Sequence, residues 1–176
     1  TNRGIVGNIY LGKIIRVLPG MQAAFVDISL DKAAFLHASD INSKLILNKE
    51  DSDNESSSDQ VPDIRTLVRE GQYLMVQVVK DPLGTKGARL TTDITIAARY
   101  LVLMPETGRA GISQRIEGDK ERNRLKKIIT PFCDDVHGFI VRTAAEGAAE
   151  QELKQDAEFL RRVWAKVIER KKRKVT

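Results

Sequence analysis

The chain has 176 residues, of which 41% are hydrophobic and 30% are charged, so it fits one globular domain or two small ones. No stretch approaches about 18 consecutive apolar residues, which excludes a membrane span, and a single cysteine, Cys133, excludes an internal disulfide and fits a cytoplasmic protein. With no CxxC or HExxH motif and two histidines far apart in sequence, no metal site is predicted.

The net charge of +5 hides an uneven distribution of charge. The segment 49–59, KEDSDNESSSD, carries five acids and one lysine, so the rest of the chain carries +9. A basic body suits a polyanionic partner such as nucleic acid. A soluble basic protein without such a partner fits the charge equally well.

Five strands are predicted in the first half of the chain: 7–17, the two strands of a hairpin within 22–41, 73–80 and 88–96. The Ser-, Asp-, Asn- and Glu-rich stretch 42–63 predicts a flexible loop, because it cannot bury enough apolar surface to fold. A short helix is predicted at 63–71, capped by Asp63 and ended by Gly71. These elements are typical of a small closed barrel of the oligonucleotide-binding kind.

The second half of the chain predicts a different arrangement. Strands are expected at 100–104, 113–116 and 139–143, and helices at 119–132 and 150–174, where apolar residues recur at helical spacing. We therefore predict an α+β fold. A five-stranded antiparallel barrel would occupy residues 4–97, and a small α/β domain with a long C-terminal helix would occupy residues 98–176.

The hairpin 22–41 places two of the nine aromatic residues unusually. In its first strand Phe25 shares a face with Asp27, and in its second strand Phe35 shares a face with His37, while the opposite faces are apolar. A phenylalanine in a strand is ordinarily a core residue. Two of them on the polar faces instead suggest a platform on which bases stack.

Three further residues are candidates for this surface. Lys86 lies in a loop between two predicted barrel strands, where side chains commonly contact backbone phosphates, and Lys13 and His37 come from neighbouring strands. With Phe25 and Phe35 they would bind single-stranded RNA or DNA by stacking and charge. The alternative for Lys86 is an ordinary solvated loop lysine.

The stretch 138–147, GFIVRTAAEG, is the second candidate site. A strand ends in Arg142-Thr143, and a guanidinium beside a hydroxyl offers several donors to a terminal phosphate. Pairing of Arg142 with Glu146 or Glu150 is the alternative. No catalytic centre is evident, because Asp27, Asp81 and Asp93 are scattered along the chain, whereas two-metal phosphodiester hydrolysis needs clustered carboxylates.

Taken together, these stretches resemble the ribonuclease E/G family. The resemblance covers nearly the whole chain apart from the acidic loop. It rests on the runs GNIYLGKIIRVLPGMQAAFVDISLDKAAFLHASDI, VQVVKDPLGTKGARLTTDIT, RYLVLMP, GISQRIE, GFIVRTAAEG and RVWAKVIERKK.

The resemblance implies an S1-type RNA-binding barrel followed by the domain called the 5′ sensor. The aromatic and lysine residues with which the family contacts RNA fall at Phe25, Phe35 and Lys86. The arginine and threonine that bind the 5′-monophosphate fall at Arg142 and Thr143. In the pocket for the terminal nucleotide, the family's valine falls at Val102 and a glycine falls at Ala98, where this chain departs from the pattern.

The resemblance also implies what lies outside this chain. The family's catalytic aspartates belong to a later nuclease domain that binds Mg²⁺, and the full-length enzyme is expected to form homodimers or larger assemblies. The chain would then be the RNA-binding and 5′-monophosphate-sensing region of a single-strand-specific endoribonuclease of rRNA maturation and mRNA decay. Two alternatives remain open, namely a stand-alone S1-type RNA-binding module and an interaction domain that uses its acidic loop.

Overall fold

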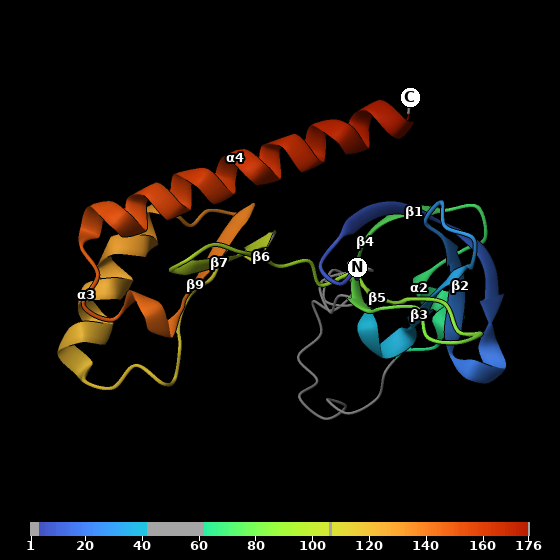
Figure 1. The fold of residues 1–176 in the computed structure, drawn as a ribbon, viewed down its shortest axis with the longest axis horizontal. Helices are drawn as coiled ribbons and strands as arrows, with labels where there is room; N and C mark the ends of the chain where they lie inside the picture. Colours follow the sequence, from blue (N-terminus) through green and yellow to red (C-terminus); the bar gives the residue numbers. More distant parts are fainter. Residues whose placement is uncertain (1–3, 42–61, 106, 176) are drawn as a thin grey trace. The chain divides into compact units, whose positions relative to one another are not determined.

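The computed structural model describes residues 4–41, 62–105 and 107–175, with side chains described as far as residue 172. The chain divides into two compact units, Thr1–Ile94 and Thr95–Thr176, which are described separately below (Figure 1). The sequence placed this boundary three residues later, at 97/98. The predicted acidic loop, 42–63, lies almost entirely outside the described residues.

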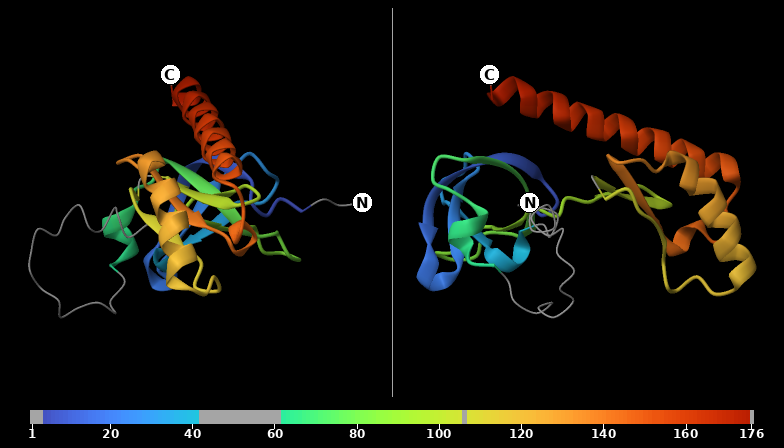
Figure 2. Two further views of the ribbon diagram at one scale, coloured as in Figure 1. Left: turned by 90° about the vertical axis from the view of Figure 1, so that its left-hand side faces the viewer. Right: turned by 180° about the vertical axis from the view of Figure 1, so that it is seen from behind.

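The first unit is a closed barrel with the strand order β1-β2-β3-β5-β4 (Figures 1 and 2). Its strands are β1 (Ile9–Leu18), β2 (Ala23–Asp27), β3 (Ala34–His37), β4 (Tyr73–Lys80) and β5 (Arg89–Thr91). A 3-10 turn, η1 (Pro19–Met21), joins β1 to β2, and a second one, η2 (Ala38–Asp40), follows β3. The predicted five-stranded barrel is confirmed.

One pair in the barrel corrects the expectation of an antiparallel sheet, because β3 and β5 run parallel, with Phe35 opposite Arg89. The other four pairs are antiparallel. The reason is geometric: in a closed ring with an odd number of strands, directions cannot alternate all the way round, so at least one neighbouring pair must be parallel.

The core of the barrel takes every second residue of its strands, as the pleat of a strand requires. On β2 and β3 the inward positions are small or medium-sized: Ala24, Val26, Ala34 and Leu36 are each fully buried. A bulge in β1 between Ile14 and Arg16 breaks the alternation there.

The loop that follows β4, residues 81–87, is held in place by several backbone contacts. Leu83 and Lys86 form an isolated antiparallel bridge, and the Lys32 ammonium donates to the Gly84 carbonyl. Gly87 passes so close to β3 that a Cβ there would lie 1.9 Å from the carbonyl oxygen of Ala33. The loop is therefore fixed against the start of β3.

The short helix of the first unit differs from its prediction. It is α2 (Ile64–Leu67), and Asp63 caps it as expected by accepting a hydrogen bond of 2.9 Å from the Arg65 amide. It ends four residues before Gly71, because Val68 is extended and only 3% exposed, packed in the barrel core. Burial of Val68 overrides the local helical pattern.

The second unit is a four-stranded sheet with the order β6-β7-β9-β8, and helices cover one face of it (Figure 1). Its elements are β6 (Ile96–Ala97), β7 (Leu101–Pro105), β8 (Ala110–Ile112), α3 (Asp119–Ile129), η3 (Thr130–Phe132), β9 (His137–Val141), η4 (Thr143–Ala145) and α4 (Glu150–Val175). The helices pack on this sheet, α4 on β7 and α3 on β8 and β9. The fully buried residues of the unit include Leu101, Leu103, Phe139 and Val141 of the strands and Leu125, Ile129, Leu153 and Leu160 of the helices. No helix within the described ranges is both long and apolar enough to cross a membrane.

Two further strand predictions are wrong in detail, one at the boundary of the two units and one in the second unit. Residues 88–96 do not form one strand, since β5 ends at Thr91 and β6 begins a second sheet at Ile96. The strand expected at 113–116 lies instead at Ala110–Ile112, and a turn from Ser113 carries Ile116 into the core, where it is 1% exposed.

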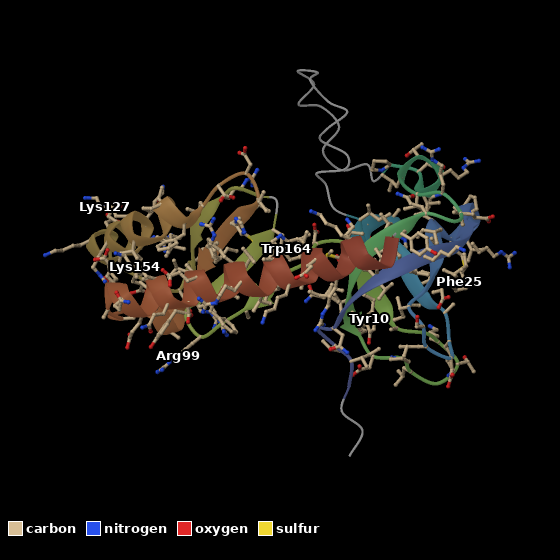
Figure 3. All side chains as sticks on the ribbon, turned by 90° about the horizontal axis from the view of Figure 1, so that it is seen from above. Tyr10, Phe25, Arg99, Lys127, Lys154 and Trp164 are labelled. Atoms are coloured by element: carbon tan, nitrogen blue, oxygen red, sulfur yellow. The ribbon has the colours of Figure 1, made fainter. Side chains whose placement is uncertain are left out.

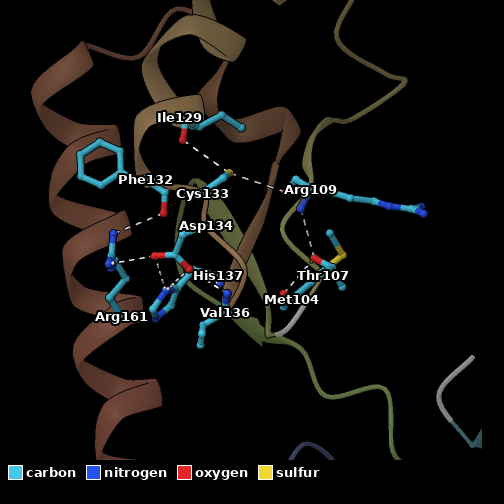
Figure 4. A network of polar contacts seen from close by, with 10 residues as sticks. All are labelled: Met104, Thr107, Arg109, Ile129, Phe132, Cys133, Asp134, Val136, His137 and Arg161. Carbon is cyan, nitrogen blue, oxygen red and sulfur yellow. Dashed lines mark hydrogen bonds and ion pairs between the residues drawn. The ribbon is translucent and has the colours of Figure 1, made fainter. Parts of the chain in front are cut away.

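The start of β9 is tied to α4 through the carboxylate of Asp134 (Figure 4). Asp134 accepts hydrogen bonds from the backbone amides of Val136 and His137, each 2.8 Å long, and contacts the His137 ring. Arg161 of α4 reaches the same carboxylate at 3.2 Å and the Phe132 carbonyl at 3.3 Å. The amide of Val136 is the main reason that the pKa of Asp134 is lowered.

The close approach at Gly87 yields a stability prediction. Replacing Gly87 with alanine is expected to lower the free energy of unfolding of the barrel by about 1–3 kcal/mol, since backbone atoms must shift to admit the methyl group. Urea denaturation measures this change. Gly20→Ala is the control, because nothing lies within 4 Å of a Cβ at Gly20. Equal stability of the two variants would contradict the packing described here.

A pH dependence follows from Glu121, which accepts bidentate bonds of 2.6 and 2.8 Å from Arg124 and one of 2.6 Å from the Gly147 amide. These bonds lower the pKa of Glu121 from 4.5 to about 2, the Arg124 contact most strongly. A carboxylate with a lowered pKa stabilises the folded state above pH 4.5 and loses this contribution as the pH falls towards 2.

Acid unfolding of the second unit is therefore expected to be less steep between pH 4.5 and about 2 in Glu121→Gln than in the unsubstituted protein. The fluorescence of the only tryptophan, Trp164, reports on this unit. Glu146→Gln, which removes an exposed glutamate next to Gly147, is the control. The same acid profile for all three proteins would refute a role of Glu121.

Candidate nucleic-acid interface

Phe25 and Phe35 lie side by side on the outside of the barrel. They are direct partners in the antiparallel β2–β3 register, so their side chains point to the same face at a Cβ separation of about 5 Å. Both are half-buried, whereas the residues before and after them in each strand point inwards. Figure 3 shows Phe25 on the barrel. The structure thus brings together the two aromatic residues that the sequence singled out.

The two rings line an open groove of about 740 Å³. Its other walls come from η1, the residues that lead into β3, the end of β4, the start of β5 and the loop 81–87. The lining residues are Met21, Phe25, Lys32, Ala33, Phe35, Lys80, Asp81, Leu83, Thr85, Lys86, Gly87 and Arg89. Exposed apolar side chains at the rim, Met21 and Leu83, extend the flat apolar surface around the rings.

The groove is positively charged. Four cationic residues line it, Lys32, Lys80, Lys86 and Arg89, against the single acid Asp81, whose carboxylate accepts a bond of 2.6 Å from the Ile5 amide. Lys86 is exposed, and its ammonium has no hydrogen-bond or ion-pair partner among the described residues. Arg89 is tethered by Asp40 at 3.0 Å.

The two remaining residues predicted for this surface lie outside the groove lining. His37 stands beside Phe35, with ring centroids 6.4 Å apart, and its Nδ1 accepts a hydrogen bond of 3.0 Å from the Ser39 amide. Lys13 lies over the ring of Tyr73, 5.9 Å from its centroid, on the β1–β4 side of the barrel. Their contacts with nucleic acid stay predictions.

The cation that adjoins Phe25 could not be located from the sequence pattern. Arg16 of β1 is the register partner of Phe25, and it is exposed. Simple alternation from the exposed Lys13 would have turned Arg16 inwards, but the bulge after Ile14 shifts the pattern by one residue. Arg89 was missed because its position depends on the parallel pairing of β3 and β5.

The second candidate site lies where β9 ends. Arg142 is exposed, its amide donates to the Tyr100 carbonyl at 2.7 Å, and its guanidinium donates to the Ala98 carbonyl at 2.6 Å. Thr143 follows, and its hydroxyl lies 3.3 Å from that of Ser113. No ion pair of Arg142 with Glu146 or Glu150 occurs among the described contacts, where Glu150 pairs with Lys154. Arg142 retains four further N–H donors.

Val102 and Ala98 lie near this corner. Ala98 is in direct contact with Arg142, and Val102 is half-buried on β7, opposite Ile140 of β9. Its neighbours Leu101 and Leu103 face the helices, so Val102 faces the other side of the sheet. The structure thus groups Arg142, Thr143 and Ala98 at the end of β9, with Val102 on the face of the sheet opposite the one on which α3 and α4 pack.

Carboxylates do not form a metal centre in the described part of the chain, where no three His, Cys, Asp or Glu residues gather to hold an ion. Asp93 has a raised pKa, chiefly because of its partial burial and secondly because of the nearby Asp40. The described residues thus offer no ligand set for the Mg²⁺ that the family resemblance implies for its nuclease domain.

Comparisons with known proteins point to one family. The model of the Ribonuclease E/G family matches residues 95–176. Ribonuclease G of Haemophilus influenzae is 64% identical over 169 residues, covering 96% of this chain and 34% of that protein. Ribonuclease G of Escherichia coli K12 is 63% identical over 176 residues, covering 99% and 35%.

Among solved structures, the solution structure of GSP13 from Bacillus subtilis matches 49% of this chain and 54% of its own, at 18% identity and a TM-score of 0.34. The sequence matches extend through both units, and the chain spans about a third of the length of the curated relatives that it matches. The chain belongs to the ribonuclease E/G family.

Proposed function

We propose that this chain is the RNA-binding and 5′-end-sensing region of a ribonuclease G-like endoribonuclease. The observation that carries the proposal is the groove in which Phe25 and Phe35 stand side by side among four cationic residues. Aromatic faces accept any base, and cations attract the phosphates between them. The groove therefore suits single-stranded RNA without a strict sequence preference.

The edge formed by Arg142 and Thr143 supports the sensing role. A 5′-monophosphate carries more charge than an internal phosphodiester and presents more free oxygens, so it rewards several donors at one point. One guanidinium N–H of Arg142 donates to the Ala98 carbonyl, and its other N–H groups stay available. A half-buried Val102 nearby offers an apolar surface for the terminal nucleoside.

In the longer protein, the barrel would hold the body of an RNA strand while the second unit tests its end. Cleavage would take place in a nuclease domain outside this chain, with Mg²⁺, on precursors of rRNA and on mRNA. The ribonuclease G relatives, which cover almost all of this chain, support the assignment.

The stacking platform is tested by Phe25→Ala. Loss of a stacked base is expected to weaken binding of short single-stranded RNA by about 1–3 kcal/mol, to the same extent for 5′-monophosphate and 5′-hydroxyl ends. Fluorescence anisotropy with a labelled oligouridylate measures the affinity. Phe159→Ala is the matched control, since Phe159 is a 50% exposed phenylalanine of α4. If both substitutions leave the affinity unchanged, Phe25 does not stack on RNA.

The sensor is tested by comparing 5′-monophosphate with 5′-hydroxyl RNA of one sequence. The monophosphate is expected to bind more tightly by about 1–3 kcal/mol, and Arg142→Ala is expected to abolish that difference. Arg162→Ala removes an exposed arginine of α4 and should preserve the preference. Thr143→Val provides a second variant at the site with no change of charge.

Equal binding of both RNAs by the unsubstituted protein would refute the sensor. Together with a loss of affinity in Phe25→Ala, that result would favour the second candidate, an S1-type RNA-binding module without a sensing role.

A further inference from the structure

Five outward residues, one from each barrel strand, lie opposite one another in the strand register. Arg16 of β1 pairs with Phe25 of β2, which pairs with Phe35 of β3. Phe35 in turn pairs with Arg89 of β5, and Arg89 pairs with Lys80 of β4. These five residues, called the cross-strand row below, place two adjacent aromatic rings between cations.

The row runs across the strands, not along them. Neighbouring strands lie about 4.8 Å apart, so three steps separate Arg16 from Arg89 by about 14 Å over the barrel surface. Two bases stacked on the rings would therefore have a cationic side chain beyond each of them.

The distribution of charge along the row favours the binding of an anion. Arg89 and Lys80 face each other directly on neighbouring strands, an arrangement that costs free energy unless negative charge offsets it. Asp40 engages the Nε of Arg89, at 3.0 Å, and thereby holds the guanidinium in one orientation. At the opposite end, Arg16 is exposed and has no hydrogen-bond or ion-pair partner in the described part of the chain.

We propose that Arg16 is a phosphate-binding residue that defines one end of the RNA path, with Arg89 and Lys80 at the other end. Single-stranded RNA then crosses the barrel along the cross-strand row. This inference rests on the proposed function, since it needs Phe25 and Phe35 to stack bases. It adds Arg16 to the interface and sets the path of the RNA across the strands of the barrel.

Arg162 distinguishes this path from general attraction to a basic surface. Arg162 is an exposed arginine of α4 in the second unit, and it belongs to no strand of the barrel. RNA that is held by the cross-strand row would lose affinity when Arg16 is replaced, and it would keep its affinity when Arg162 is replaced.

The test measures binding of a 5′-hydroxyl oligouridylate to the 176-residue chain at several salt concentrations, so that no terminal phosphate reaches Arg142. Loss of one phosphate contact to a single strand lowers the slope of log K against log salt by about 0.7. Arg16→Gln and Lys80→Gln are each expected to show this reduction, with affinity roughly fivefold weaker at 0.1 M salt. Arg162→Gln, which removes an exposed arginine of α4, is expected to change neither quantity.

The outcomes separate this inference from the proposed function. If Phe25→Ala weakens binding while Arg16→Gln leaves both the affinity and the salt slope unchanged, the path is wrong and the stacking groove stands. Equal reductions in Arg16→Gln and Arg162→Gln would also overturn the path, because they indicate general attraction to a basic surface. If the unsubstituted protein does not bind the oligouridylate, the proposed function fails and the inference fails with it.

Discussion

The inside of a five-stranded barrel holds only every second residue of its strands, and the rest of the candidate interface depends on this limit. Ala24, Val26, Ala34 and Leu36 fill the interior from β2 and β3. Because side chains alternate, Phe25 and Phe35 must then face outwards, and the register of the hairpin makes them neighbours. The packing that stabilises the hairpin therefore leaves both rings half-buried, with part of each facing the solvent.

The groove around these rings is built from parts that are already fixed before a ligand arrives. Lys32 and the close approach of Gly87 hold the loop that carries Lys86, and Asp40 orients Arg89. Side chains that need not be ordered on binding cost less conformational entropy at that moment. A loop that is held by contacts, an oriented guanidinium and two packed rings therefore suit a site that must hold a flexible polymer.

In the second unit, too, contacts with neighbouring groups position the side chains of the candidate site. Its sheet packs one face against α3 and α4, and the end of β9 delivers Arg142 and Thr143 to the edge of that sheet. Contacts with the Ala98 carbonyl and the Ser113 hydroxyl position both side chains without neutralising the arginine. A carbonyl is neutral, so an arginine that it anchors leaves a net positive charge at the site. A carboxylate partner would offset that charge, and the pair would attract a phosphate far less.

The sequence by itself determined the barrel, the second α/β unit, the long helix and the outward position of Phe25 and Phe35, because hydrophobic periodicity is a local signal. It misjudged the end of α2, the place of β8 and the direction of β5 against β3, since each is decided by burial or closure of the sheet. Only the tertiary structure showed Arg16 and Arg89 beside the rings. Their positions follow from a bulge and from the pairing of strands far apart in sequence, and no local pattern of residues encodes either one.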